Sequence, residues 1–174
     1  MSETRTPSGV PAPSDATAST ERSDFDTSPI LRSVTVARSQ ADAFELFTAG
    51  ISSWWPVSTH AIEEDAREVI FEGRVGGRIF ERTPQGLESD WGRVLAWEPP
   101  QRVVYAWQPN RDRPDPTEIE VRFVAEAEDR TRVELEHRGW DRVGEIARVG
   151  RPRYDSPNGW TMVLGAYASE AEAT

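Results

Sequence analysis

His137 is the residue of this chain whose type and position best suit acid–base chemistry. In the segment from Thr131 to Arg138, Val133, Leu135 and His137 alternate with charged residues. Alternation with a period of two predicts a β-strand that has one buried face, and it places the imidazole on that face. A buried imidazole needs hydrogen-bond partners. The more common explanation is a core histidine bonded to a carboxylate, hydroxyl or carbonyl group, and the alternative is a general base or ligand anchor.

Glu81 is the carboxylate that we expect to act with His137 if the protein is an enzyme. In the strand predicted from Arg78 to Thr83, Glu81 and Arg82 point to opposite sides, and the pattern does not decide which of them lies inside. A metal site formed by His60, His137 and Glu81 finds no support in their spacing, so we expect no bound metal. The predicted catalytic pair is therefore His137 and Glu81.

Several other chemistries are excluded by composition. The chain has no Cys, and all 20 of its basic residues are Arg. It therefore has neither a thiolate nucleophile nor a lysine for a Schiff base. We find no Ser-His-Asp arrangement, phosphate-binding loop or dinucleotide fingerprint, so we expect no cofactor.

Aromatic side chains are the strongest indication of a binding site, because the chain contains 7 Trp in 174 residues. Core filling is the more common role of any single Trp, but we expect Trp107 and Trp160 to point inward and Trp54 and Trp55 to form a lid or a helix contact. His60 lies in a polar loop that we place near the mouth of a cavity. The predicted ligand-binding residues are Trp54, Trp55, His60, Trp91, Tyr105, Trp107, Val121, Phe123, Trp160, Leu164 and Tyr167.

The elements that must position these residues are those of an antiparallel sheet. Short strand-like segments are separated by turn residues, and connections this short permit only antiparallel pairing. Pro99 and Pro100 end one strand and begin a hairpin that returns through Trp107. The seven predicted strands cover residues 31–37, 68–72, 78–83, 90–97, 101–108, 117–125 and 131–138.

Helices are predicted at two places. Ser39 is a suitable N-cap for a helix from Gln40 to Thr48, which is followed by a second short helix through Trp54. Near the C-terminus, Ser156 and Pro157 resemble an N-cap and a first-turn proline. The residues that follow at helical spacing, and that predict a closing helix with one apolar stripe, are Trp160, Val163, Leu164 and Tyr167. The predicted fold is α+β, with a curved seven-stranded antiparallel sheet wrapped around the C-terminal helix and two short helices after the first strand.

Composition and charge limit the partners and the compartment. The net charge of −10 argues against nucleic acid and against an anionic membrane surface, because both require a cationic footprint. The sequence has neither a secretory signal nor an apolar run long enough for a membrane span, so we expect a cytoplasmic protein.

Residues 1–29 are rich in Ser, Thr, Pro and Ala and are predicted to be a disordered tail, and residues 30–174 are predicted to be one domain. A homodimer is compatible with the sequence.

Five short segments resemble a known family. They are Trp54-Trp55-Pro56, Gly76-Gly77-Arg78, Trp91-Gly92-Arg93-Val94, Trp97-Glu98-Pro99-Pro100 and Leu135-Glu136-His137-Arg138-Gly139-Trp140. With the order of elements, they resemble the SRPBCC superfamily of START-like and polyketide cyclase-like proteins, in the branch named for the activator of the heat-shock chaperone ATPase. The resemblance covers Leu31 to Ala168. It implies a helix-grip fold with a cavity between the sheet and the C-terminal helix.

The resemblance leaves three functions open. The first is binding of a small apolar or aromatic molecule without chemistry. The second is a cyclase, aromatase or hydrolase that acts on a polyketide-like or aromatic metabolite, with His137 and Glu81 inside the cavity. The third is activation of a chaperone ATPase. The co-chaperone that gives the branch its name engages the chaperone through an additional N-terminal domain, and nothing in this sequence resembles that domain. We favour binding slightly over catalysis, because no catalytic motif is visible.

Overall fold

The computed structural model describes residues 24–109 and 115–173. The elements, in chain order, are β1 (Ile30–Val36), α1 (Gln40–Phe47), α2 (Ile51–Trp54), β2 (Glu68–Phe71), β3 (Arg78–Arg82), β4 (Glu88–Glu98), β5 (Arg102–Trp107), β6 (Thr117–Ala127), β7 (Arg130–Arg138), the 3₁₀ helix η1 (Trp140–Val143), α3 (Glu145–Asp155) and α4 (Trp160–Glu172). The predicted tail lies outside the described residues as far as residue 23.

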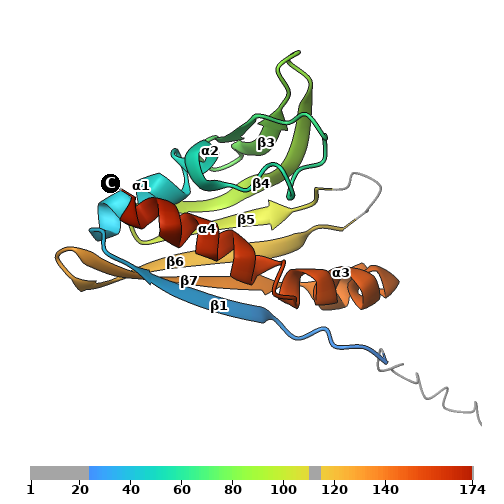
Figure 1. The fold of residues 1–174 in the computed structure, drawn as a ribbon. Helices are drawn as coiled ribbons and strands as arrows, with labels where there is room; N and C mark the ends of the chain where they lie inside the picture. The colour runs from blue at the N-terminus through green and yellow to red at the C-terminus, as the bar shows by residue number, and fades with distance from the viewer. Residues whose placement is uncertain (1–23, 110–114, 174) are drawn as a thin grey trace, which may run out of the picture.

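All seven strands belong to one antiparallel sheet in the order β1-β7-β6-β5-β4-β3-β2. The sheet curls around α4, which lies across its concave face, while α1 and α2 close one end (Figure 1). This arrangement confirms the predicted α+β helix-grip fold. The hairpin predicted at Pro99 and Pro100 is also confirmed, because β4 pairs with β5 across it.

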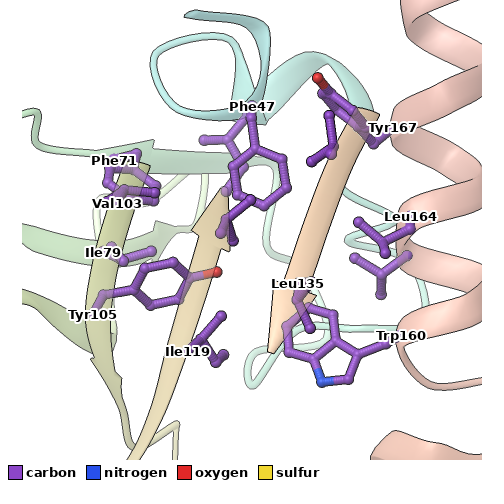
Figure 2. Packing of buried hydrophobic residues seen from close by; sticks show 14 of the residues in the cluster. Phe47, Phe71, Ile79, Val103, Tyr105, Ile119, Leu135, Trp160, Leu164 and Tyr167 are labelled. Atoms are coloured by element: carbon purple, nitrogen blue, oxygen red, sulfur yellow. The ribbon is translucent and has the colours of Figure 1, made fainter. Parts of the chain in front are cut away.

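The concave face of the sheet carries the core, as the alternating pattern predicts. Ile119, Val121 and Phe123 of β6 are buried, and so are the alternate residues of β7 that end in His137. These side chains meet residues of α1 and α4 in the space between the layers (Figure 2). Since apolar burial is the main favourable term in folding, this shared face holds the helices to the sheet.

The predicted helix boundaries are right for α1 and wrong for α4. Ser39 caps α1 by accepting a hydrogen bond from the backbone N–H of Asp42. The helix α4 begins at Trp160, however, with Gly159 as its N-cap. Ser156 is instead the residue that ends the preceding helix, α3. The predicted stripe Trp160, Val163, Leu164 and Tyr167 is buried throughout.

The helices η1 and α3 were not predicted from the sequence. The sequence of α3 contains both Gly150 and Pro152, which lower helix propensity, and so it reads locally as a loop. Tertiary contacts compensate, because Ala147, Gly150 and Arg151 are buried against the rest of the domain. Propensity is a weak determinant when such contacts are available.

Candidate ligand-binding site

A cavity of about 190 Å³ lies beside the N-terminal end of α4. Four indole rings belong to its wall, and they come from the end of α2, from β4, from β5 and from α4. The lining residues are Trp55, His60, Ala61, Ile62, Trp91, Trp107, Pro109, Tyr154, Gly159, Trp160 and Val163. Sheet, helices and the loop that follows α2 therefore all contribute to one small aromatic chamber.

Trp55 lies at the centre of the tryptophan cluster. Its ring centroid is 4.9 Å from that of Trp91, 6.1 Å from that of Trp107 and 6.4 Å from that of Trp160. None of these pairs is a face-to-face sandwich, and tilted or edge-on geometry is the arrangement that aromatic quadrupoles favour. On the far side, Tyr154 stacks on Trp160 with an interplanar angle of 26°.

Every indole N–H of the cavity wall is used by a protein acceptor. The four hydrogen bonds are Trp55 to the His60 carbonyl at 2.7 Å, Trp91 to Glu81 Oε2 at 2.6 Å, Trp107 to Tyr154 Oη at 2.8 Å and Trp160 to His137 Nδ1 at 3.0 Å. The rings are consequently fixed in orientation, and they present carbon surface to the cavity. A ligand there would be recognised mainly by aromatic contact.

Of the two residues of β3 whose facing the sequence left open, Glu81 is the one that points inward. Its side chain is completely buried, whereas Arg82 lies outside. Its carboxylate accepts hydrogen bonds from the backbone N–H groups of Ile62 and Glu63 and from the Trp91 indole. The carboxylate thus ties the loop after α2 to the sheet. Charge-assisted hydrogen bonds of this kind are the strong ones, and they satisfy a group that is costly to bury alone.

His137 is also completely buried, and both ring nitrogens are engaged. Nδ1 accepts the proton of the Trp160 indole at 3.0 Å, so the ring proton resides on Nε2 and is donated to Thr117 Oγ1 at 2.8 Å. Thr117 Oγ1 in turn donates to the carbonyl of Trp107. The imidazole therefore orders β5, β6, β7 and α4 through one directed chain of hydrogen bonds.

The structure does not pair His137 with Glu81. Glu81 is bonded to Trp91 and His137 to Trp160, and the Trp107 ring lies between these two indoles, with centroid distances of 5.8 and 6.1 Å. The two groups therefore fix the orientations of two different indoles in the same cavity wall. Among residues 24–109 and 115–173, no group of three or more acidic or His side chains is arranged to hold a metal.

The predicted ligand-binding residues fall into two sets. Five of them line the cavity, namely Trp55, His60, Trp91, Trp107 and Trp160. The other six belong to the core and are absent from the cavity wall: Trp54, Tyr105, Val121, Phe123, Leu164 and Tyr167. Trp54, for example, packs against Phe47 and Tyr167 at the other end of α4.

Tyr105 and Tyr167 differ in how their hydroxyl groups are satisfied. Tyr167 donates to the carbonyl of Ala43 at 2.8 Å, whereas Tyr105 makes no hydrogen bond to any described residue. The Tyr105 hydroxyl points into the space between the sheet and α4 (Figure 2). Burial raises the pKa of both phenols, so both stay protonated at neutral pH.

Tyr154 is one of the cavity residues that sequence reasoning missed. It lies on α3, and because α3 itself was not predicted, no pattern linked this residue to the site. Ile62 and Ala61 were missed for a similar reason, since loop residues show no periodicity. Val163 could have been found, because it shares the apolar stripe of α4 with Trp160.

His60 connects the loop after α2 to the beginning of α4. Its Nε2 lies 2.7 Å from the carbonyl oxygen of Asn158, and its Nδ1 lies 2.7 Å from Thr59 Oγ1. Because His60 also lines the cavity, this contact fixes the loop at the rim of the cavity. The predicted placement of His60 near the mouth agrees with this geometry.

Together, the curled sheet, the gripping helix and the aromatic cavity define a START-like protein of the SRPBCC class. Residues 37–169 match the family model of the Activator of Hsp90 ATPase homolog 1-like protein, and the chain belongs to that family. A comparison with curated proteins gave no significant match. No helix within the described part of the chain is long and apolar enough to cross a membrane.

Solved structures share this fold. Txn09, an anthrahydroquino-γ-pyrone synthase solved with a bound ligand, is 36% identical over 81% of this chain and 95% of its own, with a TM-score of 0.57. The self-sacrificing resistance protein CalC from Micromonospora echinospora is 28% identical over 84% of this chain and 95% of its own, with a TM-score of 0.61. The Aha1 dimer from Colwellia psychrerythraea is 19% identical over 84% of this chain and 97% of its own, with a TM-score of 0.57. This likeness shows the fold alone.

Proposed function

We propose that this protein binds a planar aromatic small molecule, of the kind that polyketide pathways produce, in the tryptophan cavity. The observation that carries the proposal is that all four indole N–H groups are directed to protein acceptors, so the wall offers aromatic carbon in fixed orientations. Such a surface gains most from a flat, apolar ligand whose rings can stack against it. The rigid wall also lowers the ordering cost of binding.

The size of the cavity limits what it holds. An apolar protein cavity of about 150 Å³ accommodates benzene. The cavity of about 190 Å³ therefore suits a portion of one or two fused rings. A larger molecule would place its remaining part outside the chamber, past the loop that contains His60.

The test is calorimetric titration with 2-naphthol against a variant that blocks the cavity. Ala61→Phe places a ring at the cavity wall and should lower the affinity at least about tenfold, because a filled site cannot also take the ligand. Ala125→Phe is the matched control, since Ala125 is exposed on β6 and is absent from the cavity wall. Equal affinities for both variants, or no binding to the unaltered protein, would contradict the proposal.

A second candidate function is ring closure of an aromatic polyketide. The observation that favours it is the 36% identity to a synthase over 95% of that protein's chain. In this case the same cavity would hold the substrate in the conformation that cyclises. Incubation of a linear aromatic-polyketide precursor with the protein, followed by chromatography and mass spectrometry, separates the two functions, because recovery of the unchanged compound supports binding, whereas recovery of a cyclised isomer or its dehydration product supports catalysis.

A further inference from the structure

A large surface groove adjoins the aromatic cavity. Its volume is about 1150 Å³, and it lies between the loop at residues 59–61, α3 and the beginning of α4. Four residues line both hollows, namely His60, Ala61, Tyr154 and Gly159. The groove therefore begins where the cavity wall ends, and no further packed layer separates them.

The groove is amphipathic. Ile146, Val149 and Met162 form its apolar part, and Val149 and Met162 are 58% and 42% exposed. Ile62, which lines the adjoining cavity, is 45% exposed. Three of the seven large hydrophobic side chains exposed in the described part of the chain thus surround one opening, and clustered exposure of this kind marks interaction sites.

Among the residues that the structure describes, Arg153 provides the only permanently charged side chain in the wall of this groove. The nearby Arg32 and Arg151 both form ion pairs with Asp155, but Arg153 forms none with a described residue. The protein as a whole carries a net charge of −10. An unpaired guanidinium in such a molecule is a local attraction for an anion, which it binds in a fork geometry.

We propose that the groove is a second subsite, which holds an anionic substituent of the aromatic ligand, with Arg153 as the charge partner. The ligand class is then an aromatic ring system that carries a carboxylate or another anion on a short arm. The rings occupy the tryptophan cavity, and the arm passes His60 and Tyr154 into the groove. This inference rests on the proposed function of the cavity.

The test compares three carboxylates with their neutral amides. The carboxylates are 2-naphthoate, 2-naphthylacetate and 3-(2-naphthyl)propanoate, so the series also measures the length of the arm. We expect the unaltered protein to bind at least one carboxylate roughly three- to fivefold more tightly than its amide, which is the range for a solvent-accessible charge pair. The preference should shrink as salt is added.

Two substitutions on α3 identify the charge partner. Arg153→Gln should remove the preference for the carboxylate and leave the affinity for the amide within about twofold. Arg148→Gln is the matched control, because Arg148 is an exposed arginine of the same helix that does not line the groove, and it should keep the preference. If Arg153→Gln still prefers the carboxylate, or if both variants lose this preference, Arg153 is not the charge partner and the inference is overturned.

The outcomes distinguish the groove from the cavity. If carboxylates and amides bind equally well to the unaltered protein, and Ala61→Phe weakens both, the cavity function stands and the groove inference fails. If neither class of probe binds, the proposed function fails and the groove inference falls with it. A carboxylate affinity that Ala61→Phe does not reduce would place the anion site apart from the cavity and would also overturn the inference.

Discussion

At the scale of single residues, His137 is positioned to hold the core together. Its ring accepts a hydrogen bond from the Trp160 indole and donates one to the Thr117 hydroxyl. Its backbone carbonyl accepts a further hydrogen bond from the Trp140 indole at 3.1 Å. An imidazole whose lone pair already accepts an indole N–H must break that bond before it can take a substrate proton. The geometry therefore favours the core interpretation that the sequence left open.

We predict that His137→Leu lowers the free energy of unfolding by about 2–3 kcal/mol, because it leaves the buried Trp160 N–H without its acceptor. His137→Gln should cost less, since an amide oxygen can still accept that hydrogen bond. Urea denaturation of both variants measures the difference. If stability is unchanged while turnover or ligand affinity is lost, His137 acts on the ligand and not on the core.

At the scale of elements, α3 is held in place by tertiary contacts and not by propensity, and ion pairs at its C-terminal end are among these contacts. Asp155, at its C-terminal end, pairs with Arg32 of β1 at 2.6 Å and with Arg151 at 3.1 Å. Hydrogen bonding from Arg32, and the charge of Arg151, hold the pKa of the Asp155 carboxyl below its ordinary value of 3.8. The same carboxylate therefore joins the first strand to the helix that carries Tyr154.

We predict that Asp155→Asn lowers the stability at pH 7 by at most about 1 kcal/mol, because the partners are partly exposed. Since the folded-state pKa is depressed, the contribution is complete above the unfolded-state pKa and is lost as the pH falls through the folded-state value. The difference between variant and parent should therefore shrink as the pH falls below 3.8 and disappear once the folded-state carboxyl is protonated. Urea titrations at several pH values measure it, and Asp141→Asn, which removes a carboxylate without a described ion pair, is the control. A difference that persists in acid would assign the effect to something other than charge.

At the scale of the whole molecule, residues 24–29 act as a strap between the N-terminus and α3. Arg151 donates to the carbonyl of Ser28 at 2.8 Å and pairs with Asp26 at 3.1 Å, and Phe25 packs against the core. The side chain of Arg151 is only 9% exposed, so its charge depends on these partners. The segment that precedes β1 therefore already makes contacts with the rest of the domain.

We predict that a chain beginning at Asp24 unfolds at the same temperature as the full chain. A chain beginning at Ile30 should unfold roughly 5 °C lower, because Arg151 then loses two of its partners and the Phe25 contact disappears. Thermal denaturation followed by circular dichroism compares the three chains. A loss of stability in the chain that begins at Asp24 would contradict the prediction of a disordered tail.

The sequence by itself determined the features that local patterns encode. The alternation in β7, the Ser39 cap and the stripe on α4 each depend on residues only a few positions apart, and each was predicted correctly. Turn residues between short strands were enough for the antiparallel topology. The family resemblance followed from the same local segments.

Only the tertiary structure decided which residues share the cavity. Hydrogen bonds join residues that are far apart in the sequence, and no periodicity predicts such contacts. They link His60 with Asn158, Trp107 with Tyr154, and Glu81 with Ile62. The facing of Glu81, the helical state of α3 and the direction of each indole N–H all depend on partners brought near by folding. The physical reason is that burial and hydrogen-bond satisfaction are settled between elements, whereas propensity and periodicity act within them.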